Sequence, residues 1–235
     1  MINVSKRRRA AVTVGSGNHD RHKKPHKKQI VPANAKKLRP DMRLWTRTNP
    51  RPLLTVFGSS RARQGSALYN EGYRLGQLLG KGGFNLATGG YPGVMEAVIR
   101  GAHDTGAHVV GVTMTAFEDK VNPYVMDEIS TNDFYQRLRW LVDRPQGYIA
   151  MLGGMGTLAE MTFTWQKLWL KMLPPRPYVL LGAAWRPVLK CWLDHLIVEP
   201  DDYDCFTVAD TPDEACAFMR NHFDREPRTL SAAAR

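Results

Sequence analysis

Three glycine-marked turns are the part of this sequence best suited to chemistry. They read GSSR at residues 58–61, TGGYPG at 88–93 and GGMGT at 153–157. Each turn follows a short apolar run and precedes a stretch with helical spacing. Glycine lets backbone N–H groups approach an anion, and the start of a helix adds a favourable dipole. The pattern predicts a site for a phosphorylated ligand such as a nucleotide.

The groups expected to bind this ligand belong to the three turns. They are Gly58, Ser59 and Ser60 in the first turn, Thr88, Gly89 and Gly90 in the second, and Gly153, Gly154, Met155, Gly156 and Thr157 in the third. None of the turns continues as the GK[ST] of a Walker A loop, and none matches GxGxxG with an acid about 20 residues later. Kinase, GTPase and ordinary NAD-binding functions therefore lose their main support.

The elements that must position these turns alternate between strand and helix. The sequence predicts strands at 52–58, 84–88, 108–114, 147–152, 177–182 and 205–209, and helices at 66–81, 92–105, 132–145, 157–173, 185–197 and 211–223, with a loop at 115–131. The strands are continuous apolar runs, as in parallel strands covered on both faces. This pattern predicts a doubly wound α/β fold with three αβα layers, in one domain at residues 51–235. Ligands bind at the carboxyl ends of such strands, where all three turns lie.

The basic excess of the chain is confined to its beginning. The net charge is +11, yet residues 1–51 hold 15 of the 33 Lys and Arg and only two acids. The remainder is close to neutral, so the pI does not indicate a basic nucleic-acid-binding domain. Residues 1–50 lack hydrophobic periodicity and predict a disordered tail. A solvated tail without function and a weak polyanion contact are the two interpretations of this segment.

The remaining composition indicates a soluble protein of a reducing compartment, and we expect a cytoplasmic location. No apolar run reaches the roughly 18 residues that a membrane span needs. The N-terminus has no apolar segment typical of a secretory signal. The three cysteines, Cys191, Cys205 and Cys216, form no CxxC pair, which argues against a zinc site.

A family resemblance rests on the same turns. GGMGTLAE at 153–160 resembles the PGGxGTxxE motif of the LOG (Lonely Guy) family. TGGYPGVMEAVIRGA at 88–102 resembles its GGGxxGxM segment, in particular the GGGPGIMEAANRGA of bacterial LOG-like nucleotide nucleosidases. FGSS at 57–60 resembles the family's first strand and turn. The resemblance covers about residues 52–200 and implies a Rossmann-like fold and a homodimer or a multiple of dimers.

The resemblance also implies an activity, namely hydrolysis of the N-glycosidic bond of a nucleoside 5′-monophosphate such as AMP or a cytokinin riboside monophosphate. The products are the free base and ribose 5-phosphate. The family's catalytic Arg and Glu fall on Arg137 and Glu160. A carboxylate stabilises the oxocarbenium-like transition state of such a cleavage, and an arginine can hold it by charge-assisted hydrogen bonds. No metal and no cofactor are implied.

Other interpretations of these residues stay open at this stage. Thr157 and Glu160 also match a capping box, in which the Glu side chain bonds the start of its own helix. Glu96 matches either a ligand to the ribose hydroxyls or a cap of the helix at 92–105. Trp165 and Trp169, one turn apart, fit a core or dimer interface better than a stack on the base.

Three departures from the family pattern bear on the activity. Leu138 stands where the family has Lys after the catalytic Arg, Ala159 replaces an acid, and Leu152 replaces the Pro before the glycines. The missing Lys removes a cation near the expected phosphate. The alternative function is therefore a non-catalytic carrier of a nucleotide or of a molybdenum cofactor on the same fold.

Overall fold

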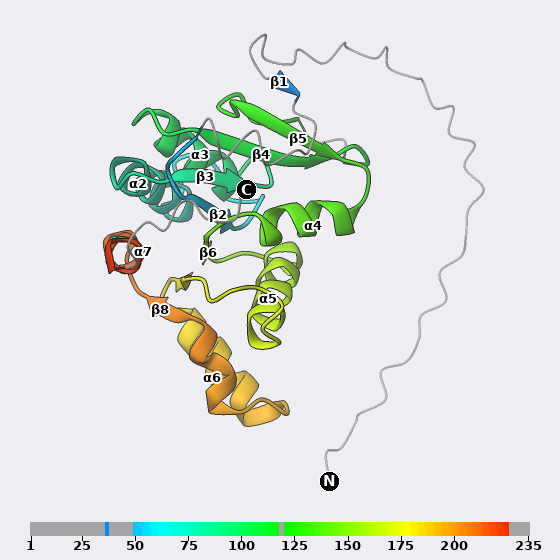
Figure 1. Cartoon of the computed structure of the whole chain (residues 1–235), viewed down its shortest axis with the longest axis vertical. Coiled ribbons are helices and arrows are strands. Elements are labelled where there is room, and N and C mark those ends of the chain that lie inside the picture. Colours follow the sequence, from blue (N-terminus) through cyan, green and yellow to red (C-terminus); the bar gives the residue numbers. More distant parts are fainter. Residues whose placement is uncertain (1–35, 38–48, 118–119, 226–235) are drawn as a thin grey trace, which may run out of the picture.

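The computed structural model describes residues 36–37, 49–117 and 120–225 (Figure 1). The strands are β1 (Lys36–Lys37), β2 (Leu53–Phe57), β3 (Asn85–Thr88), β4 (Val109–Met114), β5 (Asp127–Thr131), β6 (Gly147–Ala150), β7 (Tyr178–Leu181) and β8 (Thr207–Ala209). The helices are α2 (Ala67–Lys81), α3 (Val94–His103), α4 (Phe134–Asp143), α5 (Met155–Trp169), α6 (Trp185–His195), α7 (Pro212–Arg225) and the 3₁₀ helix η1 (Pro200–Cys205).

These strands form one parallel sheet in the order β1-β5-β4-β3-β2-β6-β7-β8. The chain builds outward from β2 through β3, β4 and β5, and then returns to the other side of β2 to place β6. The direction of building therefore reverses between β2 and β6, which pair through Val56 and Ile149. This reversal point is where an open α/β sheet forms a ligand crevice.

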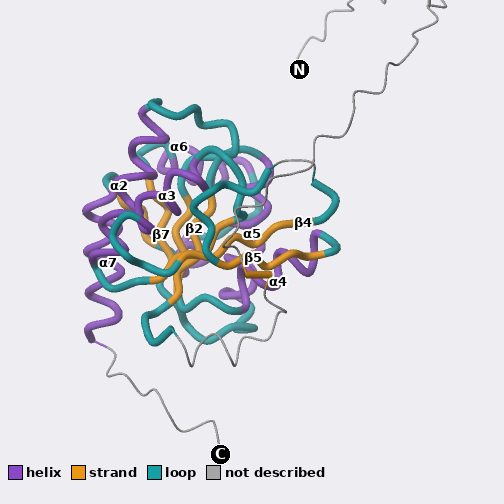
Figure 2. Tube along the Cα trace, turned by 90° about the horizontal axis from the view of Figure 1, so that it is seen from above, coloured by secondary structure: helices purple, strands orange, loops and turns teal. Residues whose placement is uncertain are grey.

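Helices cover both faces of the sheet, as the expected three-layer Rossmann-like fold requires (Figure 2). Leu54 and Val56 of β2 pack in the core cluster that contains side chains of α2, α3 and α7. Leu53 and Phe57 of the same strand pack in the cluster under α4, α5 and α6. The alternation of a strand thus sends successive side chains into opposite cores, which is why the strands are apolar throughout.

The region expected as a loop at 115–131 contains β5, so that expectation is wrong at its end. The strand reads DEIST, and its acids hid it from a search for apolar runs. Both acids are buried with partners. The Asp127 carboxylate lies 2.5 Å from His108 Nε2, and the Glu128 carboxylate accepts a 2.7 Å hydrogen bond from the Thr113 hydroxyl. Pairing of this kind lets buried carboxylates occupy an interior strand.

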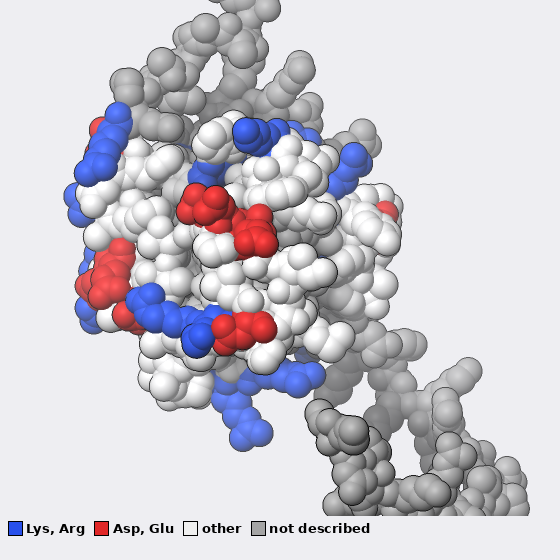
Figure 3. All heavy atoms as spheres, turned by 90° about the horizontal axis from the view of Figure 1, so that it is seen from below, with Lys and Arg blue, Asp and Glu red and all other residues white. Residues whose placement is uncertain are grey.

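The basic tail expected at residues 1–50 lies outside the described residues, apart from positions 36–37 and 49–50. Lys36–Lys37 is the short strand β1, which pairs in parallel with β5 at the edge of the sheet. On the face of the molecule seen in Figure 3, acidic and basic groups are interspersed over a mainly uncharged surface. None of the described helices is long and apolar enough to cross a membrane.

Candidate active site

The three glycine turns lie at the carboxyl ends of their strands, the edge that the sequence predicted, and they meet beside the reversal point between β2 and β6. The backbone N–H of Ser59, after β2, donates to the Leu152 carbonyl after β6 at 3.3 Å. The Ser59 carbonyl accepts from Val94 N, the first residue of α3, at 2.8 Å. Gly93 permits this contact, because a Cβ there would lie 2.4 Å from the Ser59 oxygen and its φ is 83°. The first turn therefore connects the other two.

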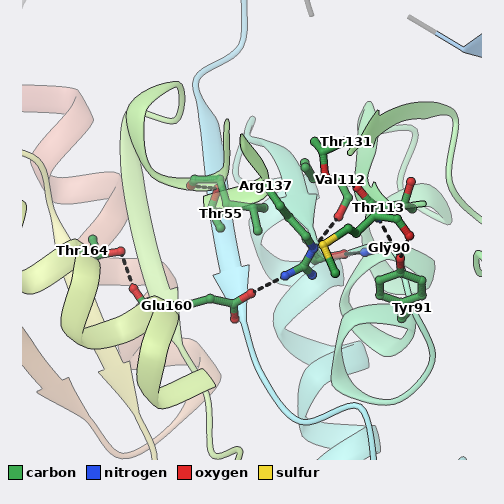
Figure 4. A network of polar contacts seen from close by, with 12 residues as sticks. Thr55, Gly90, Tyr91, Val112, Thr113, Thr131, Arg137, Glu160 and Thr164 are labelled. Carbon is green, nitrogen blue, oxygen red and sulfur yellow. Dashed lines mark hydrogen bonds and ion pairs between the residues drawn. The ribbon is translucent and has the colours of Figure 1, made fainter. Parts of the chain in front are cut away.

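Arg137 and Glu160 form a buried ion pair at this edge (Figure 4). Arg137 projects from α4 and Glu160 from α5, and Nη1 donates to Oε1 at 3.0 Å. The two residues are only 5% and 7% exposed. Arg137 Nε donates to the Val112 carbonyl of β4 at 2.9 Å, which fixes the guanidinium between the sheet and α5. The structure thus brings together the two residues assigned to catalysis.

The second turn packs directly against this arginine. A Cβ on Gly89 would lie 1.9 Å from Arg137 Nη2, so glycine is needed for the approach of the guanidinium. Gly90 has a φ of 77° and lies against Gly111 of β4. The Thr88 hydroxyl is fully buried and accepts from Gly90 N at 3.1 Å, so it shapes the turn.

The third turn forms an open helix start. Helix α5 begins at Met155, two residues before the expected start at Thr157, with Gly154 as its N-cap and no side-chain cap. Gly154 and Gly156 are exposed, and a Cβ placed on either would meet nothing within 4 Å beyond the adjacent residues and the backbone of the helix itself. The Met155 side chain is 88% exposed. The first-turn N–H groups of α5 are therefore open to approach by an anion.

The earlier start of α5 also decides between two interpretations of Glu160. Thr157 is buried inside the helix, and the N-cap is Gly154, so a capping box of Thr157 with Glu160 does not form. A Cβ on Gly153 would lie 2.1 Å from the Thr157 hydroxyl, which shows how closely that hydroxyl approaches the turn. The Glu160 carboxylate instead faces Arg137.

The remaining predicted ligands lie around this core with partners of their own. Ser59 Oγ accepts from Arg61 N at 3.0 Å, while Gly58 is buried and Ser60 is exposed. Glu96 lies in the first turn of α3 and accepts a 2.8 Å hydrogen bond from the Tyr69 hydroxyl. It therefore bonds a neighbouring helix rather than the start of its own.

Burial controls the protonation of Glu160. Desolvation raises the pKa of its carboxyl above the ordinary value, and Arg137 opposes this shift by charge and by its hydrogen bond. The Tyr178 phenol of β7 also faces this buried region, and burial followed by the charge of Glu160 raises its pKa well above 10. A carboxylate held between desolvation and a single cation is the kind of group that catalytic sites use.

One contributor to the site was not expected from the sequence. The Tyr91 ring lies against the Arg137 guanidinium, with its centroid 5.8 Å from Cζ. Its hydroxyl accepts from Met114 N at 2.8 Å and donates to Met114 O at 3.2 Å. The signal available in the sequence was an aromatic residue inside a glycine turn, where small residues are usual.

The two tryptophans of α5 differ in their surroundings. Trp165 stacks on Trp192 at 6.0 Å, contacts Tyr203 and Phe206, and donates to the Asp202 carbonyl at 2.6 Å. It belongs to an aromatic core, as expected. Trp169 is 53% exposed. In the described part of the chain, no group of three or more His, Cys, Asp or Glu could hold a metal ion.

Fold and site together define a Rossmann-like α/β protein with a buried Arg–Glu pair at the reversal point of its sheet. Residues 51–170 match the model of the SLOG cluster4 family, and the chain belongs to this family. The match contains all three glycine turns and both members of the ion pair, so the predicted resemblance is confirmed at the level of the family.

Curated relatives include phosphoribohydrolases. The cytokinin riboside 5′-monophosphate phosphoribohydrolase of Rhodococcoides fascians is 28% identical over 154 residues, which cover 62% of this chain and 76% of that protein. The enzyme named LOG3 of Arabidopsis thaliana is 29% identical over 50% of this chain and 57% of its own. An uncharacterised protein of Archaeoglobus fulgidus is 34% identical over 39% of this chain and 60% of its own.

Solved structures of molybdenum cofactor proteins share the fold of this chain. The molybdenum cofactor binding protein of Rippkaea orientalis superposes with a TM-score of 0.60 at 23% identity, over 74% of this chain and 98% of that one. The molybdenum cofactor carrier protein of Chlamydomonas reinhardtii gives 0.55 at 20% identity, over 74% and 99%. At these identities the likeness establishes the Rossmann-like fold.

Proposed function

We propose that this protein hydrolyses the N-glycosidic bond of a nucleoside 5′-monophosphate of the AMP or cytokinin riboside type. The observation that carries the proposal is the Arg137–Glu160 pair, buried at the edge where the three turns meet. The names of relatives at about 28% identity support the same class of reaction. A carboxylate beside a sugar and an open helix start for its phosphate are the two parts that such a hydrolysis needs.

In this proposal the first turn of α5 binds the 5′-phosphate through the N–H groups of residues 154–157. Glu160 lies one turn further along the same helix, where it faces the anomeric carbon and its attacking water. The C1′–N bond breaks and its electron pair leaves with the base. The water oxygen bonds to C1′, and its proton passes through Glu160 to the departing base. Arg137 keeps Glu160 ionised and oriented.

The test is incubation of the full chain with AMP and isopentenyladenosine monophosphate, with detection of ribose 5-phosphate and free base. Glu160→Gln keeps the size of the side chain and removes its charge, so we expect turnover to fall on the order of 10²- to 10⁴-fold. Asp201→Asn makes the same change on the exposed helix η1 and should leave turnover unchanged. Absence of product from wild-type protein across a nucleotide panel would refute the proposal.

A second candidate is a carrier of a nucleotide or of a molybdenum cofactor. The observation that favours it is Leu138, which is buried next to Arg137 at the position where the resembling family has Lys. With an apolar side chain at this position, the phosphate would be bound by backbone N–H groups without the Lys. A carrier could bind its ligand in this way without hydrolysing it. A thermal shift with AMP or with isolated molybdenum cofactor, without any product, would select this function over hydrolysis.

We also propose that the chain forms a homodimer through the outer face of α5. This face carries the half-exposed Trp169 and borders a pocket of about 290 Å³ lined by Thr162, Trp165, Gln166, Trp169 and Asp202. Leu170 and Met172 continue the exposed apolar surface beyond the helix. Such surfaces mark contact sites in soluble proteins. Light scattering should show a dimer that Trp169→Glu converts to a monomer.

A further inference from the structure

We infer that Tyr91 is a positioning residue, which holds the Arg137 guanidinium in the orientation that faces Glu160. The inference rests on the proposed function, because that function makes the Arg–Glu pair catalytic. Tyr91 lies in the second glycine turn, immediately after β3 and before α3, and only 4% of it is exposed. Figure 4 shows its ring beside the guanidinium, on the side away from Glu160.

The hydrogen bonds of Arg137 leave a task for such a residue. Nε bonds the Val112 carbonyl at 2.9 Å and Nη1 bonds Glu160 at 3.0 Å. Both are directional contacts through single nitrogens of the group, and a ring packed beside the guanidinium adds a contact of another kind. The Tyr91 ring, with its centroid 5.8 Å from Cζ, is within the range in which an aromatic ring attracts a cation. It therefore supplies the contact that the two hydrogen bonds lack.

Tyr91 is itself held in place at several points. Its hydroxyl makes two hydrogen bonds with the backbone of Met114, at the carboxyl end of β4. Phe117 contacts the ring edge-on with the two centroids 5.5 Å apart. The carbonyl that anchors Arg137 Nε belongs to Val112, two residues earlier on the same strand. The Val112 carbonyl and the Tyr91 ring, the two groups that contact the guanidinium here, are thus both fixed by β4, a buried strand of the sheet.

This support comes from a side chain that the resembling segment lacks. The nucleosidase-like form GGGPGIMEA has glycine where this chain has Tyr91. A role in packing alone would also bury the ring. It would not require two hydrogen bonds between the hydroxyl and the backbone of Met114 while the ring lies against Arg137. The geometry therefore gives Tyr91 a consequence for the reactivity of Glu160.

The consequence is measurable without turnover. Arg137 lowers the pKa of Glu160 against its burial, so a guanidinium that tilts away lets that pKa rise. Among the described residues, Arg137 of α4 is the charged group that shifts the pKa of Glu160, and Glu160 in turn raises the pKa of the nearby Tyr178 phenol of β7. The phenol stays neutral because its own pKa lies well above 10. A change in the Glu160 pKa therefore reports the position of Arg137.

The experiment compares Tyr91→Leu and Tyr91→Phe with wild type. The Glu160 pKa is read from carboxyl ¹³C shifts, with Glu160→Gln for assignment, and kcat and KM are measured with AMP. We expect Tyr91→Leu to raise the Glu160 pKa and to lower kcat on the order of tenfold or more, with KM little changed. Tyr91→Phe keeps the ring and loses the hydroxyl that bonds to Met114, so both effects should be smaller.

Tyr73→Leu is the matched control, because Tyr73 of α2 lies against Arg100 at 5.4 Å, outside the site. It should change neither the Glu160 pKa nor kcat. A folded Tyr91→Leu protein with wild-type pKa and kcat overturns the inference. If that variant does not fold, Tyr91→Met, which also removes the ring and keeps an apolar side chain, takes its place, and a wild-type Glu160 pKa in folded Tyr91→Met overturns the inference. If wild-type protein gives no product, the proposed function fails, while the pKa comparison still decides the role of Tyr91.

Discussion

Replacement of Gly89 by alanine should disable the site through one contact. Gly89 is outside the left-handed region, so its backbone accepts alanine. The new Cβ, however, would lie 1.9 Å from Arg137 Nη2 and 2.7 Å from Met95 Sδ. Ordinary van der Waals contact begins near 3.4 Å, so the guanidinium must move by about 1.5 Å. Arg137 is tied to Val112 and Glu160, and such a movement breaks at least one of these bonds.

The magnitude follows from the bonds lost. A hydrogen bond to a charged group contributes about 1.5–3 kcal/mol. A loss of that size lowers the Tm of a domain of this length by about 3–12 °C. A misplacement of about 1 Å at a catalytic group can reduce turnover on the order of 10²-fold, and we expect a reduction of that order in kcat.

The assay combines thermal unfolding with turnover of AMP. Gly72→Ala is the control, because Gly72 is a buried helical glycine whose added Cβ would meet its nearest neighbour, the Ala97 methyl group, at 3.3 Å. It should keep both Tm and kcat close to wild type. A Gly89→Ala protein with unchanged Tm and unchanged kcat would show that Arg137 is not clamped between the second turn and α5, and would refute the reasoning.

Three further outcomes follow from the same structure. Trp165→Ala should lower the free energy of unfolding by about 3 kcal/mol, seen as a lower Tm, because removal of the half-buried indole leaves a cavity among its aromatic neighbours. The kcat measured at a temperature well below the Tm should be retained. A loss of turnover in fully folded protein would contradict this prediction. Folding raises the pKa of Glu160, so protonation of this carboxyl favours the folded state. The stability of wild type relative to Glu160→Gln should therefore fall as pH rises from 4.5 through the raised pKa. If thermal unfolding shows that this relative stability rises with pH instead, the direction of the shift is wrong. Because the proposed reaction uses ionised Glu160, the acid limb of kcat should lie above pH 4.5. Asp201→Asn should keep this limb, and its loss from that variant would contradict the assignment of the limb to Glu160.

Much of the fold was predictable because its signals are local. The strand at 52–58, the helix at 66–81 and the three glycine turns all correspond to observed elements, since burial on both faces and turn chemistry leave a direct imprint on sequence. Strand β5 was missed because Asp127 and Glu128 are polar residues made tolerable by His108 and Thr113, and those partners are distant in sequence.

The site divides in the same way. The pairing of Arg137 with Glu160 was predicted from a resemblance, because no local rule links residues on two separate helices. The carbonyl of Val112 could not be predicted, since every residue has one and only the fold selects which is used. The role of Tyr91 depends on the crossing of the second turn with α4, which is likewise a property of the tertiary structure.

Neither the backbone conformation nor the packing requires glycine at Gly154 and Gly156. Neither has a left-handed φ, and no described neighbour would collide with a side chain at either position. Alanine at Gly156, within the first turn of α5, would favour the helix by up to about 1 kcal/mol. Glycine at this position gives up that stability and leaves the first-turn N–H groups of α5 without a side chain over them, which suits the proposed approach of a phosphate to this helix start.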